Sequence, residues 1–95
     1  MALHCLIKPM DNTSHKALLQ QLQEGDAVLF LGAATLLALD EAATAPLNDR
    51  GATLCALNSD IAAHGLPTAI DNVQIIDVAG WVALTEEHET QSQWF

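Results

Sequence analysis

The stretch Gly25-Asp26-Ala27-Val28-Leu29-Phe30-Leu31-Gly32 decides the fold class of this chain. Residues 27–31 are all apolar, without the alternation of apolar and polar side chains that marks a strand with one wet face. Continuous apolar strands are typical of parallel sheets that are covered by helices on both faces. Gly25 suits the left-handed end of a preceding helix, and Gly32 follows the strand. The pattern therefore predicts a buried parallel strand at residues 27–31.

Strand-like and helix-like segments alternate along the rest of the chain. The other strand-like runs are residues 2–7, 53–57 and 73–78. The helical segments run from Thr13 or Ser14 to Gln23, from Gly32 to Ala45 before Pro46, from Asp60 to His64 behind a cap at Asn58 or Ser59, and from Ala79 to about His88. This order predicts an α/β fold with a mainly parallel four-stranded sheet, right-handed connections and helices on both faces.

In such folds, functional groups gather in the loops beyond the C-terminal ends of the strands. Here those loops are residues 8–14, 32–36, 58–60 and 79–81. None of them carries GxGxxG or GxxxxGK[ST], so dinucleotide and phosphate binding lack their glycine-rich cradle. We expect no cofactor.

Length and composition favour one small globular domain spanning residues 1–95. A chain that is 51% hydrophobic and 16% charged is too apolar to be disordered. No apolar run approaches the roughly 20 residues that span a bilayer, and the N-terminus does not match a signal peptide. We therefore expect a soluble, cytoplasmic protein.

The charge balance restricts the partners. Twelve acidic residues face three basic ones, Lys8, Lys16 and Arg50, which gives a net charge of −9. Binding to nucleic acid requires clustered basic residues, so direct contact with nucleic acid or with an anionic membrane is not expected. A protein or a neutral small molecule fits better. The excess of apolar residues predicts an exposed apolar patch and hence an oligomer.

The two cysteines, Cys5 and Cys55, form no CxxC pair, which argues against thioredoxin-like chemistry and zinc-ribbon sites. Both lie in strand-like apolar segments and are interpreted as small buried hydrophobic residues. The alternative is a nucleophilic or sulfur-carrying thiol, which needs a nearby cation or helix N-terminus to lower its pKa.

The four histidines share no ligand spacing, so no metal site is expected. His4 lies within the first predicted strand and is interpreted as a hydrogen-bonded core residue. His15 falls in the first turn of a helix, where we expect it to be exposed. His64 and His88 fall at helix C-termini, where a cation suits the helix dipole.

Two features near the C-terminus need an explanation. The glutamates within residues 86–89 lie at a helix C-terminus, where negative charge is unfavourable unless a basic partner is near. Trp81 on the last predicted helix is interpreted as a core residue. Trp94 and Phe95 either fold back onto the domain or anchor a partner.

Several segments, in order, resemble one known family. They are Met1-Ala2-Leu3-His4, Gly25 to Leu29, Cys55 to Leu66, Ile76 to Thr85, and the pair His88 and Trp94. Together they resemble the TusB/DsrH family of sulfur-relay proteins over nearly the whole chain. The resemblance implies a Rossmann-like, DsrE-type fold. It also implies a place in a heterohexamer with two sister subunits of TusC and TusD type.

Complexes of this family pass persulfide sulfur between cysteines. In one branch the destination is 2-thiolation of the wobble uridine of tRNA, and in the other, of DsrEFH type, it is dissimilatory sulfur oxidation. The resemblance implies that the relay cysteine lies on a sister subunit. Some members of the DsrH branch carry a cysteine in the first helix, at the position of Leu18 here. This departure favours the tRNA branch. A second departure is Gly32-Ala33-Ala34, which replaces the family's acidic-Gly-Val.

These observations predict a non-catalytic subunit of a sulfurtransferase complex, with Trp81, Trp94 and Phe95 as candidate interface residues. Three alternatives remain. The first is a persulfide carrier that uses Cys55 or Cys5. The second is a small-molecule-binding α/β module, and the third is a homo-oligomer that acts alone.

Overall fold

The computed structural model describes residues 1–9 and 11–94, except for the side chain of Asn12. Its centre is a five-stranded sheet in the order β4-β3-β2-β1-β5, and every adjacent pair of strands is parallel. The strands are β1 (Ala2–Leu6), β2 (Ala27–Phe30), β3 (Thr53–Leu57), β4 (Val73–Ile76) and β5 (Thr90–Trp94). The α/β class and the parallel sheet are confirmed, and the sheet has one strand more than predicted.

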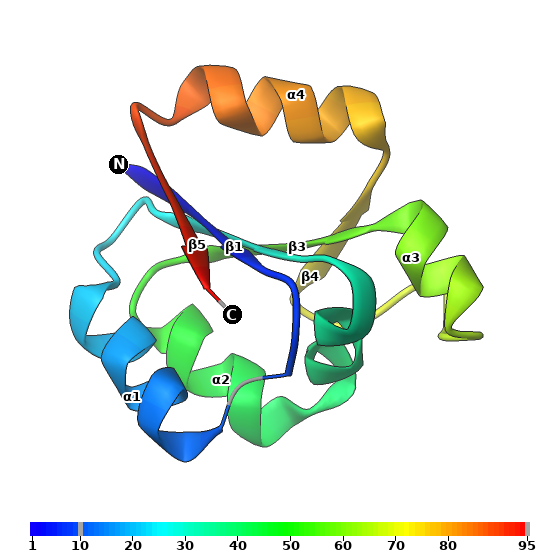
Figure 1. Cartoon of the computed structure of the whole chain (residues 1–95), viewed down its shortest axis with the longest axis horizontal. Coiled ribbons are helices and arrows are strands. Elements are labelled where there is room, and N and C mark those ends of the chain that lie inside the picture. The colour runs from blue at the N-terminus through cyan, green and yellow to red at the C-terminus, as the bar shows by residue number, and fades with distance from the viewer. Residues whose placement is uncertain (10, 95) are drawn as a thin grey trace.

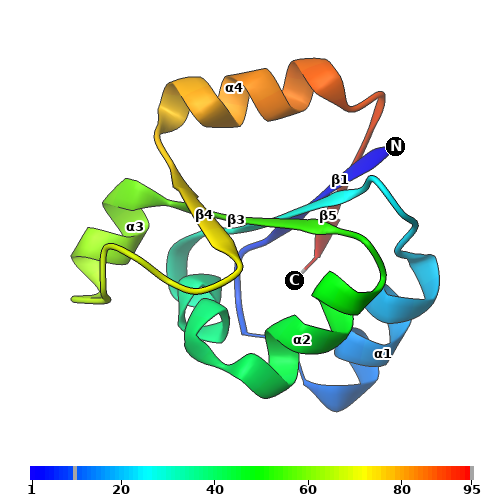
Figure 2. The same ribbon diagram turned by 180° about the vertical axis from the view of Figure 1, so that it is seen from behind.

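Helices cover the two faces of the sheet unequally (Figures 1 and 2). The helices are α1 (Asn12–Gln21), the 3₁₀ helix η1 (Gly32–Leu39), α2 (Glu41–Asp49), α3 (Asn58–Ala63) and α4 (Val78–Glu87). In both views α1 and α2 lie on one side of the sheet, and α4 crosses the other side alone.

The buried core is divided by the sheet in the same way. The larger cluster combines Leu18 of α1, Leu47 of α2 and strand residues such as Phe30. The smaller cluster centres on Leu3 and Leu29, against which Trp81 and Leu84 of α4 pack. Because side chains alternate along a strand, an all-apolar strand such as β2 serves both clusters. This explains the continuous apolar run at residues 27–31.

The fifth strand comes from the C-terminal tail. β5 pairs with β1 alone, from Ala2 opposite Thr90 to Leu6 opposite Trp94, and forms one edge of the sheet. Its sequence, Thr-Gln-Ser-Gln-Trp, has no apolar run because an edge strand leaves much of its surface in water. Trp94 therefore folds back onto the domain, which is one of the two outcomes expected for the tail. Phe95 lies outside the described residues.

Several predicted helix boundaries and caps were wrong. The segment from Gly32 to Ala45 is broken at Asp40, whose carboxylate accepts a hydrogen bond from Ala42 N–H at 3.0 Å and starts α2. Pro46 lies inside α2 instead of ending it. The cap of α1 is Asp11, which accepts from the backbone N–H of Ser14 at 2.7 Å, and not Thr13 or Ser14. The N-cap of α3 is Leu57, which makes no side-chain cap, and not Asn58 or Ser59.

Within residues 1–9 and 11–94, no helix combines the length and the apolar character needed to cross a bilayer.

Candidate functional site

A groove lies between α4 and the neighbouring strands β1 and β5. Its volume is about 610 Å³, and it is lined by Cys5, Ile7, Leu31, Trp81, Val82, Thr85, Gln91, Ser92 and Gln93. Strands β1 to β4 are added in sequence order toward one edge of the sheet. After β4, helix α4 returns the chain so that β5 pairs with the other side of β1. Open parallel sheets bind ligands at such reversals of strand order. The lining side chains are apolar or neutral, so the groove suits an uncharged ligand or an apolar protein segment.

Both cysteines occupy the face of the sheet that α4 covers. Cys5 pairs with Leu29, and Leu29 pairs with Cys55, so the three residues form one row across the sheet. Cys55 is 1% exposed, whereas Cys5 is partly exposed in the wall of the groove. The expectation of two small buried residues therefore holds fully for Cys55 and in part for Cys5.

The surroundings of both thiols disfavour the thiolate. Burial raises the pKa of Cys5 above its ordinary value. Burial and the negative charge of Glu87 raise the pKa of Cys55 to about 11. The Cys55 thiol points toward the side-chain oxygen of Gln74 at 4.0 Å. Because the thiolate is the nucleophile, neither cysteine is activated at neutral pH in the isolated chain.

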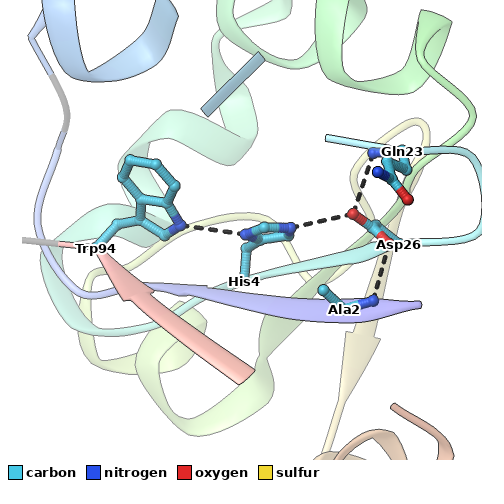
Figure 3. Close-up of polar contacts among 5 residues, drawn as sticks. All are labelled: Ala2, His4, Gln23, Asp26 and Trp94. Atoms are coloured by element: carbon cyan, nitrogen blue, oxygen red, sulfur yellow. Dashed lines mark hydrogen bonds and ion pairs between the residues drawn. The ribbon is translucent and has the colours of Figure 1, made fainter. Parts of the chain in front are cut away.

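A chain of three side chains links β5, β1 and the residue that precedes β2 (Figure 3). The indole Nε1 of Trp94 donates to Nδ1 of His4 at 3.2 Å, and Nε2 of His4 lies 3.2 Å from Oδ2 of Asp26. Asp26 also accepts from Ala2 N–H at 2.8 Å and from Gln23 N–H at 3.0 Å. His4 is 3% exposed, so the prediction of a hydrogen-bonded core histidine matches its position.

The donors fix the tautomer of His4. An indole N–H only donates, so the Nδ1 atom that receives it must carry a lone pair. The proton then sits on Nε2 and is donated to Asp26, which makes this imidazole neutral when all the hydrogen bonds form. A histidine next to an aspartate is also the arrangement of a catalytic dyad. Here the position of a nucleophile is taken by the indole of Trp94, so the contact acts as a structural tie.

Asp26 is held in its ionised form. Burial by itself raises the pKa of this carboxyl, but the hydrogen bonds from Ala2, Gln23 and His4 outweigh it. The net effect is a pKa below the ordinary value. The carboxylate is thus the acceptor that joins the start of β1 to the turn before β2.

The loop after β2 is occupied by internal hydrogen bonds. The N–H of Gly32 donates to Oδ2 of Asp60 at 2.8 Å, and the hydroxyl of Thr35 donates to the carbonyl of Gly32 at 2.7 Å. An anion at this loop would meet the Asp60 carboxylate rather than a free N–H group. The loop therefore does not suit phosphate.

The remaining histidines bind backbone carbonyls. Nδ1 of His64 and of His88 each lie within hydrogen-bond distance of the carbonyl four residues earlier, at 2.9 and 2.8 Å. His15, which we expected to be exposed, is partly buried, and its Nε2 meets the carbonyl of Ala43 in α2 at 3.0 Å. In the part of the chain that the structure describes, no three histidine, cysteine or acidic side chains gather as metal ligands.

The candidate interface residues have different surroundings. Trp81 is partly buried and packs against the smaller core cluster. Trp94 is held by His4, and its ring also packs against the larger cluster. Leu18, the position of the helix-one cysteine in some relatives, is fully buried in the larger cluster. Sequence reasoning singled out His4 and Trp94 separately but missed Asp26 as their partner, although its place immediately before a buried strand was a signal.

The strand order and the two unequal helical layers define a small Rossmann-like α/β protein. The same architecture occurs in the crystal structure of the ychN protein from E. coli, with a TM-score of 0.74 over 99% of each chain and 9% sequence identity. The family model described as DsrH like protein matches residues 8–91. The Protein TusB of Escherichia coli strain K12 is 35% identical over 94 residues, covering 97% of this chain and 99% of the relative.

The Protein TusB of Photorhabdus laumondii is 37% identical over 75 residues, covering 77% of this chain and 79% of the relative. The chain belongs to the TusB/DsrH family. The resemblance seen in the sequence segments is thereby confirmed.

Proposed function

We propose that this chain is a non-catalytic subunit of a cytoplasmic sulfur-relay complex that passes persulfide sulfur toward 2-thiolation of the tRNA wobble uridine. Family membership supports the class of complex. The observation that carries the non-catalytic role is the state of the two thiols, since burial raises the pKa of both and α4 packs over the row that holds them. The fully buried Leu18 at the helix-one position supports the same role.

In this proposal the relay cysteine belongs to a sister subunit of TusC or TusD type, and two copies of each of three subunits form a heterohexamer. The acidic chain itself does not touch tRNA, because its three basic residues provide too little charge for the phosphates. Its contribution is apolar surface that assembles and positions its neighbours.

The test is reconstitution of the chain with its two sister subunits, followed by native mass spectrometry and measurement of sulfur transfer to tRNA. We expect a heterohexamer, and we expect the Cys5→Ala/Cys55→Ala double variant to support transfer at the wild-type rate. Thermal unfolding of the double variant checks that it is folded at the assay temperature.

Three results would contradict the proposal. A persulfide on Cys5 or Cys55 that forms and decays at the turnover rate would make the chain a carrier. Assembly with sister subunits that oxidise sulfur and do not thiolate tRNA would place it in the DsrEFH branch. A homo-oligomer that ignores both sister subunits would remove it from the relay.

A further inference from the structure

The outward side of α4 is an apolar helix face that the described residues leave exposed. None of the residues of α4 is fully buried, although most of them are apolar. Val78 is 61% exposed and Val82, one turn later, is 50% exposed. Ala79 and Ala83 lie beside them and are also exposed. Residues spaced by three or four positions share one side of a helix, so these four side chains form a continuous stripe.

The stripe ends in an acidic group. Glu86 and Glu87 lie in the last turn of α4, Glu89 follows it, and all three are exposed. The last turn holds no basic residue, and among the described residues no lysine or arginine forms an ion pair with these glutamates. Negative charge at a helix C-terminus opposes the helix dipole. In the isolated chain this arrangement is slightly unfavourable, and basic side chains of a docked partner would relieve it.

We infer that this face docks a protein partner whose apolar patch is flanked by lysine or arginine side chains. The surface, named here the α4 face, consists of Val78, Ala79, Val82, Ala83, Glu86, Glu87 and Glu89. The inference rests on the proposed function and makes the partner one of the sister subunits. Val82 also lines the groove beside β5, so the α4 face and the groove form one connected surface.

Charge selects this occupant over the others. In a second copy, α4 packed on α4 would bring two groups of three glutamates together. Lys16 lies on α1 and Arg50 follows α2, on the side of the sheet away from α4 (Figure 1). An anionic membrane would be repelled by the same glutamates. An apolar protein surface with a rim of basic side chains would pack against the apolar stripe and pair with the three glutamates of the α4 face.

Two variants separate docking from stability. Val78→Glu places a charge in the stripe at the first residue of α4, where a negative charge favours the helix. Glu86→Gln/Glu87→Gln/Glu89→Gln removes the acidic group and its conflict with the dipole. Both variants should leave the free chain as stable as the wild type or more stable, while both weaken docking. A substitution at a surface with only a structural role would not lower the affinity for a partner while it keeps or raises the stability of the free chain.

Matched controls lie elsewhere on the molecule. Leu39→Glu changes an exposed leucine at the end of η1. Glu24→Gln/Glu41→Gln/Asp49→Asn removes three exposed negative charges, so both triple variants change the net charge from −9 to −6. The measurement is calorimetric titration of the purified sister-subunit complex with each chain, from low to high salt.

We expect Val78→Glu to weaken binding by about tenfold or more. We expect the α4 triple variant to weaken it at low salt and to flatten its salt dependence. The controls should match the wild type. Wild-type affinity in both α4 variants would overturn the docking face and leave the proposed function intact. Tighter binding by the α4 triple variant would overturn the basic rim. Self-association of the chain that Val78→Glu abolishes would make a second copy the occupant. Absence of any wild-type binding would overturn both proposals.

Discussion

Replacing Asp26 by asparagine should destabilise the fold by about 3 kcal/mol, because an amide cannot rebuild the buried network. Three N–H groups, from Ala2, Gln23 and His4, converge on the two carboxylate oxygens of Asp26. An asparagine offers one oxygen, and its NH₂ group then faces a donor in either orientation. A change of tautomer at His4 does not help, since a proton on Nδ1 would oppose the indole N–H of Trp94.

The magnitude follows from two contributions. Leaving one buried donor without an acceptor costs about 1–3 kcal/mol, and a hydrogen bond to a charged group contributes about 1 kcal/mol more than a neutral one. A domain of this size has a total free energy of unfolding of roughly 5–14 kcal/mol. A loss of about 3 kcal/mol therefore lowers the melting temperature by roughly 12 °C or more.

The effect should depend on pH in a defined direction. The pKa of Asp26 in the folded chain lies below its ordinary value. The stabilisation by the carboxylate is therefore fully present above the ordinary aspartate pKa of about 3.9. It is lost as the pH falls through the lower pKa of the folded state. The difference between wild type and Asp26→Asn should be full at neutral pH and shrink in strong acid.

The assay is urea unfolding followed by tryptophan fluorescence at several pH values. Asp40→Asn is the matched control, because Asp40 is an exposed helix cap and asparagine caps a helix equally well. Equal stability of Asp26→Asn and wild type at neutral pH would refute the network. A difference that grows toward acid would refute the sign of the pKa shift.

Three further predictions follow from the same structure. Trp94→Phe removes the donor to His4 and should cost about 1–2 kcal/mol, with faster amide exchange in β5 measured by NMR; unchanged exchange would show that the indole does not fasten this strand. At neutral pH, Cys55 should react with a thiol reagent only as fast as the fold opens, and Cys5 should react more slowly than a free thiol. The reactions are followed by absorbance, and fast labelling of Cys55 would contradict its burial. Pro46→Ala restores a helical N–H within α2 and should stabilise the chain by about 1 kcal/mol or more in thermal unfolding, whereas a loss of stability would mean that the fixed proline backbone matters more.

The parallel sheet could be predicted because its inner strands carry a local signal. An apolar run such as residues 27–31 is long enough to be covered on both faces and is bounded by glycine and a charged residue. β5 carries no such signal, since its four polar residues belong to an edge that pairs with a single neighbour. The break at Asp40 between η1 and α2 was also not predicted. The alanine-rich sequence on both sides of Asp40 favours helix equally, so it gives no local signal for the break.

The site was predictable only residue by residue. His4 was correctly expected in the core, and Trp94 was recognised as a side chain that needs a contact. Their meeting depends on the register of β5 on β1, which places Ser92 opposite His4 and Trp94 two residues further on. Register across strands distant in sequence is a tertiary property, so the sequence pattern could not identify Asp26 as the third member.

The sheet geometry also bears on whether sulfur moves through this chain. Cys5 and Cys55 lie in one row with β2 between them, so their backbones are two strand spacings apart, or about 10 Å. A disulfide requires Cα atoms within about 7 Å, and persulfide transfer likewise requires contact between sulfur atoms. Leu29 fills the row between them and α4 packs above it. Any sulfur that reached Cys5 from the groove would therefore have to leave by the groove, which supports a relay whose route lies on the neighbouring subunits.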